Sequence, residues 1–516
     1  MNGAECLLRT LLANEVDLCL MNPGTSEMQF VCALDRVPGM RAVLCLFEGV
    51  CSGAADGYAR MLGKPAATLL HLGPGLANAL ANFHNARKAR SPVVSLVGEH
   101  ATQHLLYDAP LSSRIEAFAR TVSGWVRVPE RADQIGAAAA AAVQASFGPP
   151  GQVATLIVPA DYSWSPAGEP GPAAPRPVRH APDSAAVREA ARILSSGQPA
   201  GLLLSGSALL ARGLRASGRI AAATGARVFA DRFGARLERG AGLFAPVLVP
   251  YFPEAAETAL AGLKHLILVE AQPPVSFFAY PGRRSCVAPE DCAFHVLASA
   301  EEDGAAGLEA LSQECAAGGF SAPLAGPARP ELPHGLPLTA GAAGRAIGAL
   351  LPEGAIISDE AVSSGGDIWP HLAGAPPHDH LPVSGGSIGH GLPAALGAAL
   401  AVKGRKTIAL EADGSGMYTL QSLWTMAREG LDVVAVILAN RRYRILEIEM
   451  RRTGAPAIGP LASGMIDIGR PDLDWVKLAA GMGVPAARAL TADEFIAAFA
   501  VAMKESGPRL IEAVIA

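Results

Sequence analysis

Two short stretches decide the fold of this chain, Ala412-Asp413-Gly414-Ser415 and Ala439-Asn440-Arg441-Arg442. A short apolar run, 407–411, precedes the first stretch, and a run rich in β-branched residues, 433–438, precedes the second. Runs of this length and composition predict buried strands, and residues 420–428 between them have the pattern of a helix. A strand, a helix and a second strand form a βαβ unit. We therefore expect two parallel strands whose carboxyl ends emerge at one edge of a sheet.

This spacing predicts that the side chains of Asp413 and Asn440 lie beside each other at the start of a helix. A carboxylate and a carboxamide offer the hard oxygen ligands that suit Mg²⁺, which keeps open positions for the oxygens of a diphosphate. A helix N-terminus also attracts phosphate groups. Asp-Gly is a common turn and Asn commonly ends a strand, so an ordinary loop is the alternative interpretation. The pattern predicts a site for a metal-bound diphosphate.

The spacing resembles the fingerprint of thiamine-diphosphate-dependent enzymes, a Gly-Asp-Gly followed by a late Asn-Asn pair. Ala412 and Ala439 replace the first Gly and the first Asn of that fingerprint, whereas Asp413 and Asn440 are kept. The resemblance implies that Asp413, Asn440 and the backbone carbonyl of Arg442 bind Mg²⁺. The cofactor-binding residues that it implies at this end are Asp413, Gly414, Ser415 and Asn440.

A second segment begins with a carboxylate at the end of a predicted strand. The apolar run 41–47 leads directly to Glu48, and residues 49–60 follow as a helix rich in small residues. This segment resembles the pyrimidine-binding part of the same enzymes, in which a Glu hydrogen-bonds the aminopyrimidine and promotes removal of the thiazolium C2 proton. Proton transfer of this kind depends first on the position of the carboxylate. The alternative is an ordinary first-turn Glu that the helix dipole favours.

A third segment, 384–395, is rich in glycine and lies upstream of Asp413. It resembles the loop that bends the cofactor in these enzymes. The resemblance implies that Ile388 is the apolar wedge between the two rings and that the carbonyl of Gly386 accepts from the 4′-amino group. Glycine lets the backbone approach a ligand closely. The remaining residues implied to bind the cofactor are Ser387, Gly24 and Gly73.

The two cofactor-binding halves of the chain also resemble each other. At a constant offset of 340, residues 68–70 overlay 408–410, and residues 92–97 overlay 432–437. Two Pro-rich stretches, 163–182 and 321–337, interrupt the chain. The fold class we expect is α/β, with three doubly wound parallel-sheet domains. They are a pyrimidine-binding domain at 1–165, a central α/β domain at 185–320 and a diphosphate-binding domain at 338–516.

The central domain raises the question of a flavin, because in this superfamily it either carries a non-redox flavin or is only structural. The stretch 200–207 opens this domain, and Gly206 lies at a predicted strand end but lacks the Gly-x-Gly-x-x-Gly spacing of a dinucleotide site. We therefore regard FAD as unlikely and expect thiamine diphosphate and Mg²⁺ as the cofactors. A nicotinamide-dependent dehydrogenase built on this domain is an alternative that a titration with NAD(H) tests.

Composition limits the possible partners and compartments. Of the 516 residues, 50% are hydrophobic and 17% are charged, and the net charge of −5 provides no basic footprint for nucleic acid. No apolar run reaches the roughly 20 residues that span a membrane. The start of the chain lacks the pattern of a signal peptide. The eight cysteines are scattered without metal-ligand spacing. We expect a cytoplasmic protein with reduced cysteines and neither nucleic acid nor membrane as a partner.

The resemblance extends to acetolactate synthases and to benzoylformate decarboxylase. It implies catalytic roles for Glu48, for His71 at a strand end, and for His104 in a loop; packed or solvated histidines are the alternative for the last two. Pyruvate decarboxylases have a second catalytic Glu about six residues after the metal-binding Asn, where this chain has Leu446. An apolar residue there would slow protonation of the enamine and favour its capture by a second carbonyl.

These observations predict an acetolactate synthase-like carboligase that decarboxylates a small-molecule 2-oxo acid and transfers the enamine to an acceptor carbonyl. A simple decarboxylase of the benzoylformate decarboxylase type is one alternative. A weakly catalytic cofactor-binding homologue, or a regulatory partner, is another because Ala412 and Ala439 alter the fingerprint. Neither cofactor-binding half carries both Glu48 and Asp413. We therefore expect a homodimer or homotetramer with active sites at the subunit interface.

Overall fold

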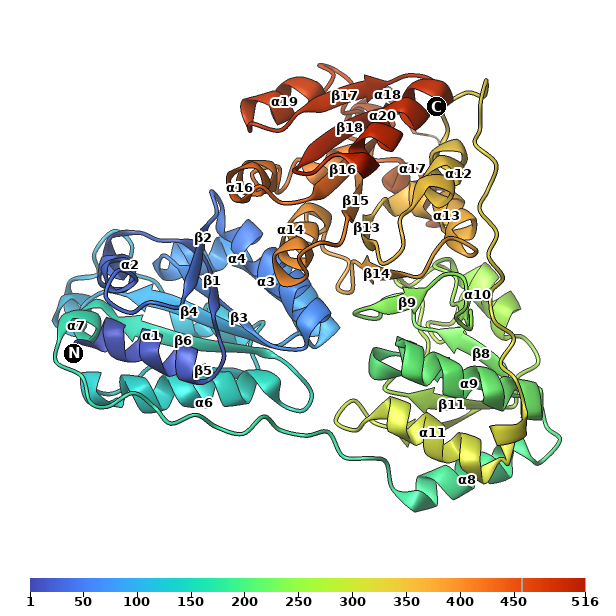
Figure 1. The fold of residues 1–516 in the computed structure, drawn as a ribbon, viewed down its shortest axis with the longest axis horizontal. Coiled ribbons are helices and arrows are strands. Elements are labelled where there is room, and N and C mark those ends of the chain that lie inside the picture. Colours follow the sequence, from blue (N-terminus) through green and yellow to red (C-terminus); the bar gives the residue numbers. More distant parts are fainter. Residues whose placement is uncertain (456–457, 516) are drawn as a thin grey trace.

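The computed structural model describes residues 1–455 and 458–515, which form three α/β domains, each built on one sheet (Figure 1). The sheets have six, five and seven strands. Within the described residues every strand pairing is parallel except the one between β9 and β14. The expected fold class of three parallel-sheet domains is therefore confirmed.

The first sheet has the strand order β2-β1-β3-β4-β6-β5. Strands β3, β4 and β6 are buried along almost their whole length, as a parallel sheet with helices on both faces requires. Its strands are β1 (Leu18–Asn22), β2 (Arg41–Leu44), β3 (Ala66–Leu70), β4 (Val93–Glu99), β5 (Trp125–Arg127) and β6 (Val153–Pro159). Its helices are α1 (Gly3–Ala13), η1 (Thr25–Glu27), α2 (Met28–Ala33), α3 (Glu48–Leu62), α4 (Leu72–Ala89), η2 (Thr102–Tyr107), α5 (Ile115–Arg120), η3 (Ala132–Gln134), α6 (Ile135–Phe147) and α7 (Ala160–Trp164).

The central domain is built on the sheet β10-β8-β7-β11-β12. One strand of this part of the chain, β9, leaves the domain and pairs antiparallel with β14 in the third sheet, which the sequence did not indicate. The strands here are β7 (Ala200–Leu204), β8 (Arg227–Ala230), β9 (Leu237–Arg239), β10 (Val247–Leu248), β11 (His265–Val269) and β12 (Ala293–Ala298). The helices are α8 (Ser184–Leu194), η4 (Gly206–Leu209), α9 (Ala211–Thr224), α10 (Pro253–Leu260), α11 (Gly304–Glu314) and η5 (Ala317–Gly319).

The third sheet has the order β17-β18-β16-β15-β13-β14-β9. Its strands are β13 (Ile356–Glu360), β14 (His378–Pro382), β15 (Thr407–Ala412), β16 (Val433–Ala439), β17 (Ala486–Ala489) and β18 (Arg509–Val514). Its helices are α12 (Ala340–Leu350), η6 (Val362–Ser364), α13 (Gly365–Ile368), η7 (Trp369–Leu372), α14 (Gly391–Ala401), α15 (Asp413–Gly416), α16 (Ser422–Glu429), α17 (Arg444–Arg452), α18 (Pro460–Gly464), α19 (Trp475–Gly481) and α20 (Ala492–Lys504). Without β9, this order repeats that of the first sheet strand for strand, as the offset of 340 indicated.

The predicted βαβ unit is present as β15, α16 and β16, and the two strands pair in parallel with Ala412 opposite Leu438. The helix starts later than predicted because the short helix α15 and a turn precede it. In the first domain, β2 ends at Leu44, before the predicted strand end, and an extended Phe47 caps α3.

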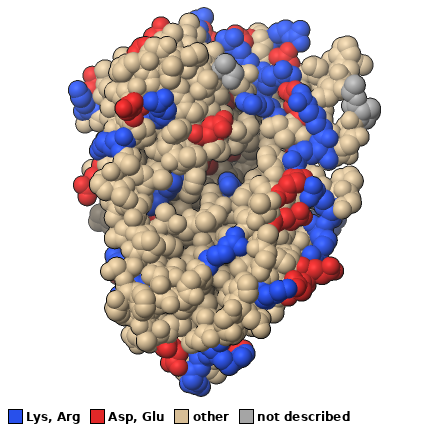
Figure 2. Space-filling view, turned by 90° about the vertical axis from the view of Figure 1, so that its right-hand side faces the viewer, with Lys and Arg blue, Asp and Glu red and all other residues tan. Residues whose placement is uncertain are grey.

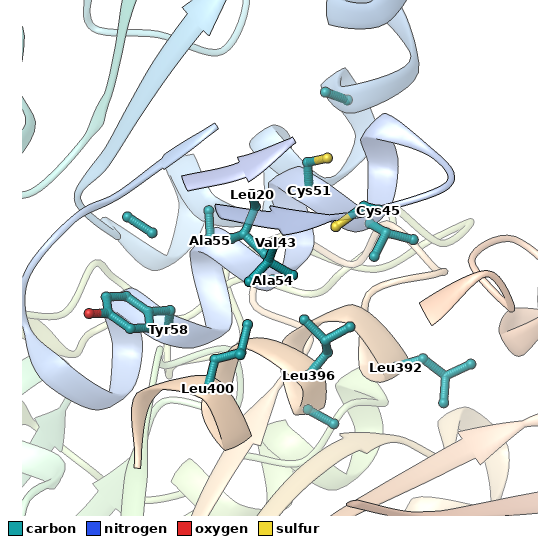
Figure 3. Close-up of a cluster of buried hydrophobic side chains, with 14 of the residues drawn as sticks. Leu20, Val43, Cys45, Cys51, Ala54, Ala55, Tyr58, Leu392, Leu396 and Leu400 are labelled. Atoms are coloured by element: carbon teal, nitrogen blue, oxygen red, sulfur yellow. The ribbon is translucent and has the colours of Figure 1, made fainter. Parts of the chain in front are cut away.

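Helices α3 and α14 hold the first and third domains together. A Cβ added to Gly57 would lie 2.2 Å from the carbonyl oxygen of Ala394, and one added to Gly397 would lie 1.9 Å from that of Ala54. Glycine therefore lets the two helices approach backbone to backbone. Figure 3 shows apolar side chains of both helices facing one another in a shared core.

The eight cysteines form no disulfide. Within the described residues, none of the helices combines the length and the apolar character that a membrane crossing requires. On the face shown in Figure 2, Lys and Arg side chains are interspersed with Asp and Glu and are separated by broad neutral areas.

Candidate active site

The end of β15 holds Asp413 in a buried position. Its Oδ1 accepts a hydrogen bond from the backbone N–H of Gly414 (3.0 Å), and its Oδ2 accepts one from that of Arg441 (2.6 Å). Asn440 follows the neighbouring strand β16, and its Oδ1 accepts from the N–H of Arg442 (3.0 Å). Asp413 and the segment 440–442 are therefore brought together at one sheet edge, as the spacing predicted.

The donor set at this edge suits a hard cation. Burial raises the pKa of Asp413 to about 6, although hydrogen bonds from backbone N–H groups, that of Arg441 first, oppose the rise. A buried carboxyl group with a raised pKa gains from a nearby cation, which favours its ionised form. Among the described residues, no group of three His, Cys, Asp or Glu side chains could hold a metal. A site made of one carboxylate, one amide and one carbonyl fits Mg²⁺, which usually keeps several waters and takes few protein ligands.

The glycine-rich segment 384–390 lies between β14 and α14 and crosses over helix α4. Asn85 fixes its centre, because its Nδ2 donates to the carbonyl of Ser387 (2.8 Å) and its Oδ1 accepts from the N–H of Ser387 (3.1 Å). Gly386 has φ +74°, and a Cβ there would lie 2.4 Å from the ring of Phe277. Ile388 is half-buried beside it. This tight backbone path is compatible with the loop that the resemblance implied.

Glu48 is the first residue of α3 and is almost completely buried, with 9% exposure. Its Oε2 accepts a hydrogen bond from Nδ2 of Asn78 (3.0 Å), and its Oε1 lies against the first turn of α4 at Gly75. An N-terminal helix position and one amide donor hold the carboxylate in a defined orientation. No hydrogen bond or ion pair joins Glu48 to Asp413 or Asn440 within residues 1–455 and 458–515.

His71, which is partly exposed, pairs with the buried Glu27, and the sequence did not reveal this pair. Its Nδ1 lies 2.8 Å from Oε2 of Glu27, which also accepts from the N–H of Gly24 (2.8 Å). Burial raises the pKa of Glu27, and the other carboxyl oxygen of this residue is buried without a hydrogen-bond partner among the described residues. Gly24 lies directly on the imidazole ring of His71. The spacing Gly24-x-x-Glu27 at a helix start was the available signal, because it is a capping pattern.

The structure does not place Gly73 or His104 in the pair that His71 forms with Glu27. Gly73 lies in the first turn of α4, where a Cβ would meet Oγ of Ser113. His104 is exposed in η2, and its ring neighbours are His100 (5.3 Å) and Tyr107 (6.0 Å). Their roles in cofactor binding and catalysis stay predictions.

Asn82 bridges the two cofactor-binding domains. Its Nδ2 donates to the carbonyl of Gly49, which follows Glu48, and to the carbonyl of Gly389 in the glycine-rich segment (2.9 and 3.0 Å). Its Oδ1 accepts from Asn85 (3.0 Å). Asn78, Asn82 and Asn85 recur at helical spacing along α4, and that stripe was the signal in the sequence.

Two further carboxyl groups lie beneath the glycine-rich segment. Glu360 and Glu411 are direct neighbours in the paired strands β13 and β15. Glu360 accepts from the backbone N–H groups of Gly389 (2.8 Å), His390 (2.9 Å) and Gly391 (2.6 Å). Burial raises the pKa of Glu360 to about 7, and burial together with Glu360 holds the pKa of Glu411 well above its ordinary value. Glu360 therefore anchors the segment to the sheet.

Family models match both ends of this arrangement. Residues 1–120 match the thiamine pyrophosphate enzyme, N-terminal TPP binding domain, and residues 365–513 match the thiamine pyrophosphate enzyme, C-terminal TPP binding domain. The chain therefore belongs to the thiamine pyrophosphate (thiamine diphosphate) enzyme family.

The similar proteins include one named as a putative acetolactate synthase and others named as decarboxylases. The chain is 53% identical over its whole length to 99% of the Mycobacterium tuberculosis protein named "Putative acetolactate synthase large subunit IlvX". It is 29% identical to benzoylformate decarboxylase of Pseudomonas aeruginosa, over 95% of this chain and 94% of that protein. The fold matches the 4-hydroxybenzoylformate decarboxylase of Rhodococcus jostii RHA1 with a TM-score of 0.86, 24% identity, and coverage of 100% and 99%.

Proposed function

We propose that this protein is a Mg²⁺-dependent carboligase that releases CO₂ from a 2-oxo acid and joins the remaining fragment to an acceptor carbonyl. Thiamine diphosphate, when bound, supplies the electron sink for loss of CO₂. Asp413, Asn440 and the carbonyl of Arg442 hold the metal. Glu48 accepts and returns a proton at the pyrimidine.

The observation that carries the carboligase proposal is the state of helix α17, which follows the metal-binding segment. Leu446 lies there with 46% exposure, and the two nearby carboxylates are engaged elsewhere. Glu447 pairs with Arg451 (2.7 Å), and Glu449 accepts from the hydroxyl of Tyr280 (3.0 Å). These positions therefore provide no free carboxylic acid that could protonate the enamine. Protonation is disfavoured, and transfer of the enamine to an acceptor carbonyl is favoured. The name of the 53% identical relative agrees with this choice.

A simple 2-oxo acid decarboxylase is the second candidate. The pair of His71 with the buried Glu27 favours it, because a histidine held by a carboxyl group can deliver a proton to the reacting carbon. The similarity to benzoylformate decarboxylase supports the same candidate.

The proposed active unit is a homodimer or homotetramer in which each site takes Glu48 from one subunit and Asp413 from another. Each of these residues lies at a strand end of a different domain, and the segment after β4 exposes apolar side chains. Leu106 is 86% exposed and Tyr107 is 75% exposed. Large apolar exposure of this kind marks interaction surfaces.

Mixing inactive Glu48→Gln and Asp413→Ala chains tests the shared site. A mixed dimer with shared sites regains one site that has both native residues, so activity should return. No recovered activity after subunit exchange, with the exchange verified by mass spectrometry, would contradict a shared site.

The reaction is tested by offering a set of 2-oxo acids and aldehyde or ketone acceptors to the holoenzyme. We expect CO₂ release together with ligation products in the mass spectrum. Aldehyde formation alone would favour the decarboxylase. Cofactor binding without CO₂ release would favour a weakly catalytic homologue. We further propose a cytoplasmic location, because a reducing compartment suits eight unpaired cysteines.

A further inference from the structure

The central domain has the layout of a nucleotide-binding sheet. Its order, β10-β8-β7-β11-β12, changes direction between β7 and β11, and open α/β sheets bind ligands outside the carboxyl ends of the strands at such a point. A cavity of 1090 Å³ opens there, between the first and central domains. Phosphate groups in such crevices bind at helix N-termini.

A carboxylate of the chain itself fills that position. Glu270 follows β11 and is 2% exposed, and its backbone adopts the left-handed conformation at φ +54°. Its Oε1 accepts from the backbone N–H of Ser207 (3.1 Å), from the hydroxyl of the same residue, and from the N–H of Gly304 (3.0 Å). Gly304 is the first residue of the eleven-residue helix α11, so the carboxylate lies at a helix N-terminus.

The second oxygen completes the arrangement that a bound phosphate would have. Oε2 of Glu270 lies 2.7 Å from Nη1 of Arg179 in the linker between the first two domains. It also lies 2.0 Å from where a Cβ of Gly206 would be, so the turn after β7 closes directly on it. The carbonyl of Glu270 accepts from Nη1 of Arg90 in the first domain (3.0 Å). Two N–H groups, a hydroxyl and a guanidinium therefore converge on one anion.

We propose that Glu270 is a built-in substitute for a ligand phosphate, which closes the nucleotide site of the central domain. The carboxylate supplies the negative charge at the start of α11 and joins the central domain to Arg179 and, through its carbonyl, to Arg90. The orientation of the first two domains is thereby fixed without a dinucleotide. The residues present do not fit a flavin or nicotinamide nucleotide, because its phosphates would need the space of the Glu270 side chain.

The test opens the site by mutation. Wild-type, Glu270→Ala and Glu270→Gln proteins are saturated with thiamine diphosphate and Mg²⁺, so that the diphosphate site is filled, and are titrated calorimetrically with ADP. The Ala variant removes both the charge and the bulk of the side chain, and we expect it to bind ADP at least ten times more tightly than wild type. The Gln variant keeps the bulk and should show no gain. ADP should also raise the Tm of the Ala variant alone.

Equal ADP affinity of wild type and Glu270→Ala would overturn the proposal, as would a gain in Glu270→Gln equal to that in the Ala variant. If Glu270→Ala does not fold, Glu270→Ser purified in inorganic phosphate provides the second measurement. Its Tm should then depend on phosphate, whereas that of wild type should not. Absence of this dependence would also overturn the proposal.

Discussion

The first and third domains have the same strand order but carry different residues after their strands. After β3, the first domain places His71, which is paired with a buried carboxyl group, and after β2 it places Glu48. After the matching strands β15 and β14, the third domain places Asp413 and the glycine-rich segment. In the proposed function, one architecture carries proton chemistry in one copy and anion and metal binding in the other. Such a division would require both domains to come together at each site.

Glu48→Gln tests the proton-handling half and should have the largest effect. The amide keeps the volume and the bond to Asn78 but cannot share a proton with the pyrimidine, so exchange of the cofactor C2 proton should slow by about 10²–10⁴-fold. Deuterium exchange followed by acid quenching and NMR measures this rate, while cofactor affinity stays near that of wild type.

A matched control uses the first-turn Glu of α1. Glu5→Gln removes a carboxylate from a comparable helix position and should leave C2 exchange unchanged. Equal rates in Glu48→Gln and wild type would reduce Glu48 to an ordinary helix-dipole residue.

Asp413→Ala tests the binding half. Loss of the anionic ligand should weaken Mg²⁺-dependent cofactor retention by more than about 100-fold, because even residues that only support a metal ligand cost about 10–100-fold. Asn440→Ala should weaken it less, since the lost ligand is neutral. Calorimetric titration with thiamine diphosphate and Mg²⁺ measures both.

Asp472→Ala is the control for this pair of variants, because Asp472 is exposed and, among the described residues, its ion pair is with the side chain of Arg441 (3.0 Å). Its affinity should match that of wild type. Undiminished cofactor affinity in Asp413→Ala would remove the metal site from this edge of the sheet.

Much of this comparison could be predicted from the sequence. Asp413 and Asn440 end apolar strands in a βαβ unit, so their proximity follows from local pattern and the handedness of such units. The offset of 340 predicted two copies of one doubly wound module, and the matching strand order of the two sheets agrees with that prediction. Both signals are local or repeat at a fixed distance along the chain, which is what pattern reasoning detects.

The contacts that were missed all depend on segments that meet only after folding. Glu27 reaches His71 because η1 approaches the end of β3. Glu360 and Glu411 become neighbours through strand pairing across a long connection. Strand β9 has three residues, which are too few for a hydrophobic period, and it pairs with a strand of another domain. The sequence therefore does not indicate its partner. These contacts depend on how segments distant in the sequence pack together, and residue type alone does not predict them.

Asn82→Ala tests the connection between the two halves. The variant removes two buried hydrogen bonds, to the carbonyls of Gly49 and Gly389, which keep the hydroxyl donors of Ser52 and Thr419. The free energy of unfolding should fall by about 2 kcal/mol. Urea denaturation measures the change. Asn2→Ala removes an ordinary N-cap of α1 and should cost about 1 kcal/mol. Equal losses in the two variants would show that Asn82 contributes no more than a local cap.

The smallest effect concerns two buried carboxyl groups, Asp56 of the first domain and Glu360 of the third, whose contributions to stability change with pH in opposite directions. Burial would raise the pKa of Asp56 in the first domain, but Arg60 and His390 hold it well below its ordinary value. Its contribution to stability is present above the unfolded pKa and is lost as the pH falls. Burial raises the pKa of Glu360 from 4.5 to about 7. The folded protein then binds the additional proton, so the contribution of Glu360 is lost as the pH rises through this window.

In the cofactor-free protein we expect Glu360 to lower the free energy of unfolding by on the order of 1–2 kcal/mol between pH 4.5 and 7. Glu360→Gln cannot titrate, so its stability should decline less steeply over this range, whatever its absolute value. Urea denaturation at pH 5, 6 and 7 gives the slopes. The exposed Glu116→Gln variant should keep the slope of wild type. A Glu360→Gln slope equal to that of wild type would show that Glu360 binds no additional proton in the folded protein over this range, and its contrast with Asp56 would then be absent.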